Sequence, residues 1–298
     1  MALQRRVKSC FLEKIIMKHR FGSLKDWLAL TRAEHAVIVL IAVMASEFVV
    51  SKRFSSDFLF PALGPALITL GAFAWNDYFG IKTDKALKRM DRPLVSGKIN
   101  SRIAFHIAIA LFALGVFLTL FVNQTVFLIA IAFAVLSMLY DPVLKKIPLL
   151  GNAFIASSMS ISFLYGNYAV VSTLNSFVLL FSAIAFAGGL GRELVLTLRD
   201  VKGDEKIGAK TLPMLLGHFK TIVLASVLFH LAVVMSLVPL ATDRNLGYMV
   251  FIGITDVLFL ISAWTLTFNQ SRPMLEKVRN YTLWGLLSGV VAFAALGF

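Results

Sequence analysis

Nine long apolar segments constrain the fold of this chain more than any other feature of its sequence. They cover residues 33–50, 58–79, 103–122, 125–140, 151–171, 175–197, 221–241, 247–268 and 281–298. A helix needs about 20 mostly apolar residues to cross the hydrocarbon core of a bilayer. The segments therefore predict an all-α, polytopic membrane protein with nine transmembrane helices in a bundle. We expect one integral-membrane domain that spans residues 1–298.

The composition supports lipid as the solvent of this chain. Hydrophobic residues make up 58% of the sequence and charged residues only 15%, against about a quarter in a soluble domain. This balance excludes a soluble enzyme and a disordered chain, and the single cysteine, Cys10, excludes an intrachain disulfide. The net charge of +13 would suggest nucleic acid as the partner of a soluble protein. In a membrane protein it reflects basic cytoplasmic loops, so we expect no nucleic-acid partner.

The basic residues also predict the topology. With nine spans, 26 of the 29 Lys and Arg residues fall on the side of the N-terminus, and the other three are Lys52, Arg53 and Arg244. The positive-inside rule then predicts a multi-pass cell-membrane protein with a cytoplasmic N-terminus, two cytoplasmic aspartate-rich loops, and the C-terminus outside. Residues 1–25 are basic and are expected to lie on the membrane surface, or else to form an unstructured tail.

Two pairs of aspartates carry the strongest chemical signal. Asp77 lies at the end of the second apolar segment and Asp84 follows that segment, and Asp200 and Asp204 follow the sixth. Spacings of seven and four residues place each pair on one helix face. Paired carboxylates suit Mg²⁺, which prefers oxygen ligands and keeps phosphate oxygens and water in its shell. The pattern predicts a magnesium–diphosphate site, and the alternative is a set of solvated loop charges.

These acids lie within stretches that resemble a known family. Residues 76–84, followed by Arg92-Pro93-Leu94-Val95-Ser96-Gly97, resemble the first aspartate-rich motif of the UbiA superfamily of intramembrane prenyltransferases. Residues 192–204, followed by Gly208-Ala209-Lys210-Thr211-Leu212-Pro213, resemble its second motif. Residues 140–146 and 151–152 resemble the tyrosine–lysine stretch after its fourth helix. The resemblance covers the chain from about residue 28 onward.

The resemblance implies a prenyltransferase that moves a polyprenyl group from its diphosphate with Mg²⁺ as cofactor. It assigns catalysis and metal binding to Asp77, Asp84, Asp200 and Asp204. We expect the other site residues to bind substrate. These residues are Asn76, Arg32, Lys82, Arg92, Tyr140, Lys145, Lys146, Asn152 and Arg199. Lys82 is chosen by its position alone, and the others are carried over from stretches that resemble the family.

Two positions depart from the family pattern. Gly80 stands where the first motif usually has its middle acid, and Thr197 stands where many members carry another acid. Because glycine permits unusual backbone conformations, we expect Asp84 to compensate if the helix unwinds at Gly80.

The start of the first span narrows the choice of substrate. Residues 31–36 and 41–43 resemble the opening of archaeal digeranylgeranylglyceryl phosphate synthases, with Ala33 in place of a proline. This implies geranylgeranyl diphosphate as donor and geranylgeranylglyceryl phosphate as acceptor, in ether-lipid biosynthesis. Arg89 or Arg92 is our candidate for contact with the acceptor phosphate. The alternatives are an aromatic acceptor of the 4-hydroxybenzoate or naphthoate type in quinone biosynthesis and, in a different class, a secondary transporter.

Overall fold

The computed structural model describes residues 21–206, 208, 210–242 and 244–298. The basic surface segment expected before residue 21 lies outside this range. A long helix coincides with each of the nine apolar segments in the described part of the chain. These helices are α3 (Ala33–Ser51), α4 (Leu59–Ala86), α5 (Ser101–Thr119), α6 (Gln124–Tyr140), α7 (Leu150–Val170), α8 (Ser176–Lys206), α10 (His218–Ser236), α11 (Leu246–Phe268) and α12 (Arg272–Ala295).

Short elements connect the long helices. The helix α2 (Leu24–Thr31) precedes α3, and α9 (Leu212–Leu216) lies between α8 and α10. Three 3₁₀ turns cover Ser56–Phe58, Leu144–Lys146 and Pro239–Ala241. Within the described residues, six segments are long and apolar enough to cross a membrane: Ala33–Ser51, Ser56–Ala86, Ser101–Thr119, Ser176–Val201, His218–Ala241 and Leu246–Phe268. The chain is therefore an all-helical protein with several candidate spans.

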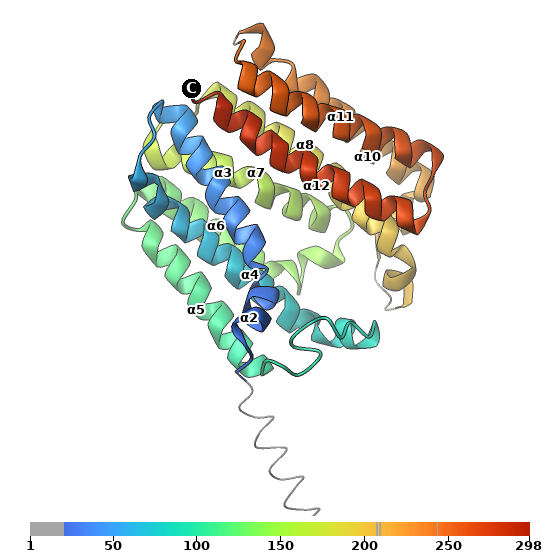
Figure 1. The fold of residues 1–298 in the computed structure, drawn as a ribbon. Coiled ribbons are helices and arrows are strands. Elements are labelled where there is room, and N and C mark those ends of the chain that lie inside the picture. Colours follow the sequence, from blue (N-terminus) through green and yellow to red (C-terminus); the bar gives the residue numbers. More distant parts are fainter. Residues whose placement is uncertain (1–20, 207, 209, 243) are drawn as a thin grey trace, which may run out of the picture.

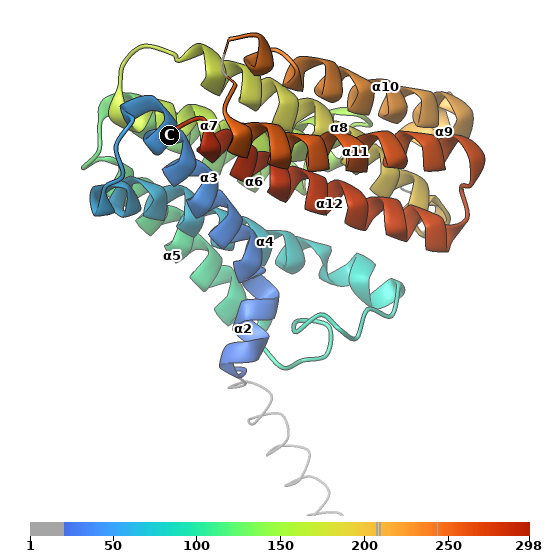
Figure 2. The ribbon, with the colours of Figure 1, turned by 45° about the horizontal axis from the view of Figure 1, so that its top comes forward.

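The helices form two groups that repeat one arrangement. In the first group α4 packs against α3 and α5, and in the second α8 packs against α7 and α10. Figures 1 and 2 show α3, α4 and α5 together on one side and α8, α10, α11 and α12 together on the other. The last helix, α12, packs against α11 and α8 and also reaches α3. The aspartate pairs thus lie toward the C-terminal ends of two equivalent helices, α4 and α8.

Small residues bring helices into close contact both within the first group and between the two groups. A Cβ added to Gly115 on α5 would lie 2.8 Å from the carbonyl oxygen of Gly64 on α4. A Cβ added to Gly166 on α7 would lie 2.5 Å from the carbonyl oxygen of Val43 on α3. Backbones that approach this closely gain dispersion contacts without the hydrophobic drive that water supplies. These crossings fix the positions of α3, α4 and α7 around the site.

The aspartate pairs lie on helices, as their helix-face spacings predicted, although the sequence analysis also placed them in two aspartate-rich loops. The second and sixth apolar segments end at residues 79 and 197, whereas α4 continues to Ala86 and α8 to Lys206. Hydrophobicity ends where a span leaves lipid, but the i to i−4 hydrogen bonds of a helix do not need apolar side chains. Both motifs are therefore held on rigid helical extensions.

Candidate active site

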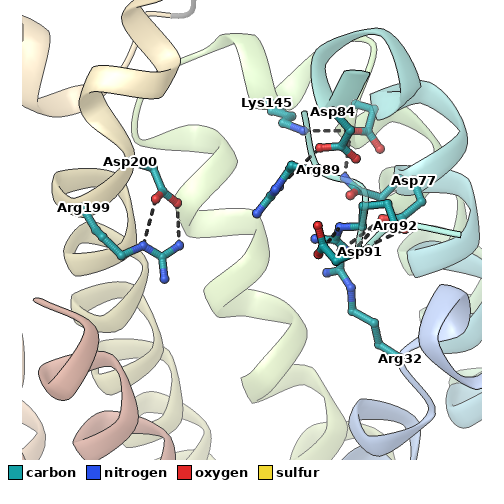
Figure 3. A network of polar contacts seen from close by, with 11 residues as sticks. Arg32, Asp77, Asp84, Arg89, Asp91, Arg92, Lys145, Arg199 and Asp200 are labelled. Atoms are coloured by element: carbon teal, nitrogen blue, oxygen red, sulfur yellow. Dashed lines mark hydrogen bonds and ion pairs between the residues drawn. The ribbon is translucent and has the colours of Figure 1, made fainter. Parts of the chain in front are cut away.

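Asp77 is the centre of the first cluster. Its side chain is only 2% exposed, and its Oδ1 lies 3.0 Å from Arg32 Nη2 and 3.3 Å from Arg92 Nη1. Figure 3 shows both guanidinium groups directed at this carboxylate. A buried carboxylate is costly unless charged partners satisfy it. The three residues come from α4, from the junction of α2 and α3, and from the segment after α4, so their meeting fixes one end of the bundle.

A left-handed backbone places Arg32. Its φ of 46° and ψ of 58° end α2 and start α3. This conformation costs a non-glycine residue about 1 kcal/mol or more and persists only where surrounding contacts hold it. The guanidinium carbon of Arg32 lies 4.5 Å from the centre of the Phe73 ring. Ring and carboxylate together hold the guanidinium at the mouth of the bundle.

A compact turn places Arg92. The Ser96 hydroxyl donates to the Arg92 carbonyl oxygen at 3.0 Å, and the Lys98 backbone N–H donates to the Pro93 carbonyl oxygen at 3.0 Å. Gly97 closes the turn with a φ of +71°, a conformation that side chains disfavour. The segment from Arg92 to Gly97 therefore forms a hydrogen-bonded turn that positions the Arg92 guanidinium.

Asp84 lies about two helical turns beyond Asp77 and is also buried. Its Oδ1 lies 3.3 Å from Arg89 Nη1. The expected unwinding at Gly80 does not occur, because α4 is helical without a break from Leu59 to Ala86. A Cβ added to Gly80 would lie 3.7 Å from Asp84 Oδ2 and would meet nothing closer. The missing acid of the motif therefore leaves open space on the face that carries Asp84.

The second motif forms a separate pair. Arg199 donates to Asp200 through Nε at 2.8 Å and through Nη2 at 2.6 Å. Figure 3 shows this pair on α8, apart from the cluster around Asp77. Arg199 thus contacts the motif acid directly. A two-point guanidinium–carboxylate contact holds the acid in one orientation.

Asp204 links the two halves electrostatically. Burial and the negative charge of Asp200 raise the pKa of Asp204, and the positive charges of Lys145 and Arg89 oppose the rise. The neighbouring Gly203 faces the end of α4, where an added Cβ would lie 3.8 Å from Leu87 Cδ2. The end of α8 therefore approaches the segment after α4.

Asp141 is a site residue that sequence reasoning missed. Asn76 Nδ2 donates to Asp141 Oδ1 at 2.8 Å, and Lys145 Nζ lies 3.3 Å from the same oxygen. Burial raises the pKa of Asp141, while Lys145 and Asn76 oppose the rise. Asp141 thereby joins two residues that were predicted separately. The available signal was an acid at the end of a span, four residues before Lys145 and between Tyr140 and Pro142.

The remaining predicted residues lie at different distances from these clusters. Tyr140 stacks on Phe154 with ring centres 5.4 Å apart, and Lys145 Nζ lies 6.0 Å from the Tyr140 ring centre. Asn152 Nδ2 donates to Thr197 Oγ1 at 3.0 Å, which joins α7 to α8. Lys146 and Lys82 are exposed. The position of Lys82 is about 160° around α4 from that of Asp84, so Lys82 is not brought into the cluster.

The acids fit a magnesium ion only if phosphate completes its shell. Among the described residues, no three His, Cys, Asp or Glu side chains are grouped closely enough to hold a metal ion by themselves. The glycine at position 80 and the threonine at position 197 account for part of this. Mg²⁺ commonly takes one or two carboxylates together with substrate phosphates and water. The hard oxygen donors of Asp77, Asp84, Asp200 and Asp204 are of the right kind for that mode.

Comparison with known proteins identifies the fold and its family. Residues 36–295 match the model of the UbiA prenyltransferase family. The chain belongs to the UbiA prenyltransferase family. It is therefore an enzyme that transfers an alkyl group other than methyl, and the transporter alternative is excluded. As a UbiA enzyme it is also a membrane protein, in agreement with its long apolar helices.

Several relatives of this UbiA protein carry the name digeranylgeranylglyceryl phosphate synthase. The digeranylgeranylglyceryl phosphate synthase of Archaeoglobus fulgidus is 32% identical over 294 residues, which cover 96% of this chain and 100% of the relative. The enzyme of the same name from Thermococcus kodakarensis is 33% identical, covering 73% of this chain and 77% of the relative. The Methanothrix thermoacetophila enzyme of the same name is 37% identical over a stretch that covers 66% of this chain and 71% of the relative.

Solved structures agree with the fold. A structure of digeranylgeranylglyceryl phosphate synthase in membranes superposes with a TM-score of 0.75 at 27% identity, covering 92% of this chain and 98% of that one. A UbiA homologue from Archaeoglobus fulgidus bound to DMAPP and Mg²⁺ superposes with a TM-score of 0.66 at 17% identity. The match covers 90% of this chain and 99% of that one. At that identity the second likeness concerns the fold alone.

Proposed function

We propose that this UbiA enzyme transfers a geranylgeranyl group from its diphosphate to geranylgeranylglyceryl phosphate, with Mg²⁺ as cofactor, in ether-lipid synthesis. The observation that carries the proposal is the buried Asp77 carboxylate held between Arg32 and Arg92 beside a second acid motif. Acids and arginines at the mouth of an apolar bundle suit a charged headgroup on a long hydrocarbon chain. The similarity to enzymes that bear the synthase name supports the choice of substrates.

In this proposal the chain's basic residues receive the diphosphate. Arg32, Arg92 and Lys145 each sit within contact distance of an acid in the structure, so they can turn to phosphate oxygens while the acids hold metal. When bound, Mg²⁺ neutralises the charge that builds on the leaving diphosphate. The bond between carbon 1 of the donor and the diphosphate oxygen breaks, and the electron pair leaves with the diphosphate. The acceptor hydroxyl oxygen bonds to carbon 1, and its proton passes to the departing diphosphate.

The hydrocarbon chain of the donor needs a dry environment, because water would quench an allylic cation. A small apolar cavity of about 30 Å³ between α3, α4, α6 and α7 lies on the path of this hydrocarbon chain and must widen to admit it. Its walls include Val39, Ile68, Ile129, Phe133 and Tyr165. The cavity begins at Thr69, eight residues and about 12 Å along α4 from Asp77. Aromatic rings at the cavity, such as Phe133, which lines it and stacks on Phe154, can stabilise positive charge through their faces.

We also propose that all nine long helices cross the membrane, with the acid motifs in the cytoplasm. Contacts at one end of the bundle join the starts of α3 and α7 to the final turns of α4, α6 and α8. At the other end Lys52 donates to the Leu296 carbonyl oxygen and Asn123 Nδ2 donates to that of Tyr168 at 2.8 Å. This alternation matches the separation of basic residues along the chain.

The test is an assay of the purified protein in lipid nanodiscs with labelled geranylgeranyl diphosphate. Geranylgeranylglyceryl phosphate and 4-hydroxybenzoate are offered separately, with Mg²⁺ or with EDTA. We expect a radiolabelled ether lipid only with the first acceptor and only with Mg²⁺. If the protein prenylates 4-hydroxybenzoate and forms no ether lipid, the aromatic alternative is correct. If ether lipid forms in EDTA, the reaction does not need Mg²⁺.

A further inference from the structure

One face of α4 has a polar side chain on either side of an open position. Asn76, Gly80 and Asp84 follow each other at intervals of four residues on a helix that is unbroken from Leu59 to Ala86, so they lie on the same face. A Cβ added to Gly80 would lie 3.7 Å from Asp84 Oδ2. Apart from its own helix backbone and chain neighbours, nothing else among the described residues would lie within 4 Å of it. The position that the family motif fills with an acid is therefore open space.

The end of α6 lies against α4 beside Asn76. Trp75 Nε1 donates to the Met138 carbonyl oxygen at 3.1 Å, and Asn76 Nδ2 donates to Asp141 Oδ1 at 2.8 Å. Asp141 directly follows the last residue of α6 and keeps helical φ and ψ angles of −66° and −45°. Asn76 and position 80 are one helical turn apart, about 6 Å along α4. The Asp141 carboxylate is therefore held next to the open position by a residue of the same helix face.

Asp141 is buried, and only one of its two carboxylate oxygens has partners. Its side chain is 6% exposed, and Oδ1 takes both polar contacts, from Asn76 Nδ2 and from Lys145 Nζ at 3.3 Å. Oδ2 is buried, and no described residue donates a hydrogen bond to it. An ion pair with Lys145 accounts for Oδ1 and leaves Oδ2 unexplained. A buried carboxylate oxygen without a partner carries a desolvation cost, which a cation at that oxygen would remove.

Asp84 borders the open position from the other side. It pairs with Arg89 at 3.3 Å, and Figure 3 shows Lys145, the ion-pair partner of Asp141, directed toward Asp84 and Arg89. The side chain of Lys145 is 49% exposed and that of Arg89 is 43% exposed. Both cations are therefore free to turn to phosphate oxygens when a metal ion takes their place at the acids.

We propose that Asp141 supplies the carboxylate that the first motif lacks at position 80, and that its Oδ2 is a ligand of the Mg²⁺ ion bound with the donor diphosphate. This inference rests on the proposed function. Asp84 is the partner ligand from α4, and the hydrogen bond from Asn76 holds the Asp141 carboxylate in place. Because Mg²⁺ commonly takes one or two carboxylates together with phosphate oxygens and water, the site needs no third protein acid.

The test measures metal binding without turnover. Protein in nanodiscs is dialysed against radioactive Mn²⁺, which like Mg²⁺ prefers oxygen ligands. Geranylgeranyl thiolodiphosphate, a donor analogue that resists ionisation, is present at a concentration that saturates each variant. In Asp141→Asn, which keeps the shape of the side chain, we expect the Kd for Mn²⁺ to rise about 10- to 100-fold, at least the effect of removing a neighbour of a metal ligand. An unchanged Kd in a folded Asp141→Asn variant would overturn the proposal.

Asp57→Asn is the matched control. It makes the same change at an exposed aspartate in the 3₁₀ turn before α4, at the opposite end of that helix. Its Kd for Mn²⁺ should equal that of the wild type. An equal loss of Mn²⁺ affinity in Asp57→Asn and Asp141→Asn would show a non-specific effect of charge and would also overturn the proposal.

Two further variants separate a metal ligand from a residue that only positions Lys145. Adding Gly80→Asp to Asp141→Asn should restore most of the lost Mn²⁺ affinity, because it fills the open position, and the gain should exceed that in the wild type. Lys145→Gln breaks the ion pair and keeps the acid, so it should weaken analogue binding and leave the Kd for Mn²⁺ unchanged. No rescue by Gly80→Asp, or an equal loss of Mn²⁺ affinity in Lys145→Gln, would mean that Asp141 acts through Lys145 and not as a ligand.

A second metal keeps the test decisive if Asp141→Asn does not fold, as judged by its melting temperature without metal. Asp141→Cys, in a Cys10→Ser background, places a thiolate at the same position, and thiolates prefer soft cations. This variant should bind Cd²⁺ more tightly than its Cys10→Ser parent when the analogue is present. Equal Cd²⁺ affinity in the two proteins overturns the proposal.

Failure of the proposed function has a separate signature. If the wild type binds Mn²⁺ with the analogue but forms no ether lipid, the proposed acceptor is wrong, and the dialysis still decides the role of Asp141. If the wild type binds no Mn²⁺ with the analogue, the metal of the proposed function and the ligand role of Asp141 are both wrong.

Discussion

The gap at position 80 offers the sharpest test of how the first motif binds metal. Replacing Gly80 with aspartate puts a carboxylate on a helix that runs unbroken through this point. The new Cβ would lie 3.7 Å from Asp84 Oδ2, an ordinary van der Waals distance. Gly80 is not among the glycines with a positive φ, so the substitution requires no change of backbone.

The geometry of α4 gives the expected size of the effect. Along an ideal helix the Cα atoms of Asp77 and Asp84 are about 10.5 Å apart, and position 80 lies about 4.5 Å from the first and about 6 Å from the second. Two oxygens on one Mg²⁺ lie at most about 4 Å apart. Asp77 and Asp84 reach one ion only if both extend along the axis, whereas a carboxylate at position 80 can share an ion with either. We expect the Mg²⁺ concentration for half-maximal activity to fall about tenfold, or ~1.4 kcal/mol.

Stability should change little in this variant. The like charges of positions 80 and 84 cost about 0.2–0.5 kcal/mol at a spacing of four residues. Removing glycine from a helix interior returns a few tenths of a kcal/mol, since aspartate is the better helix former. The melting temperature therefore serves as a control that is independent of metal binding.

The assay is a Mg²⁺ titration of prenyl transfer, run on the wild type, Gly80→Asp and Gly80→Asn. The asparagine variant matches the aspartate in shape but lacks its charge, and it should keep the wild-type Mg²⁺ requirement. An unchanged requirement in a folded, active Gly80→Asp variant would refute the helix-face reasoning for the first motif. Lost activity with an unchanged melting temperature would show that the open space beside Asp84 is needed by substrate.

Three further predictions concern the second motif and the topology. Asp200→Asn and Asp204→Asn should each lower kcat/KM about 100-fold, because a metal ligand loses its charge; near-wild-type turnover at low Mg²⁺ would reject either residue as a ligand. Because the pKa of Asp204 is raised above its ordinary 3.8, protons compete with Mg²⁺ as the pH falls, so the Mg²⁺ requirement should climb toward acid pH and should climb less in Asp204→Asn. A cysteine at Met90, in a Cys10→Ser background, should react with a membrane-impermeant maleimide only after the cells are opened; labelling of intact cells would invert the topology.

The positions of the helices follow from the sequence. Each apolar segment coincides with a long helix, and the first begins at residue 33 in both prediction and structure. Composition is sufficient here because lipid leaves the backbone no hydrogen-bond partners except its own. The prediction erred at the ends of α4 and α8, since a hydropathy pattern records where lipid ends and not where a helix ends. The motif aspartates could be predicted as metal ligands because their residue type and spacing are visible within one segment of the sequence.

The partners of those acids were decided by the tertiary structure. Arg32 reaches Asp77 across 45 residues of chain, and Asn76 reaches Asp141 across 65. No periodicity within one segment connects such residues, so Asp141 was missed and Lys82 was chosen for its sequence position alone. The sequence determined which segments enter the membrane and which acids stand at their ends, because hydrophobicity and charge are local properties. Which arginine faces which acid depends on how the helices cross, and the close contacts at Gly64, Gly115 and Gly166 set those crossings.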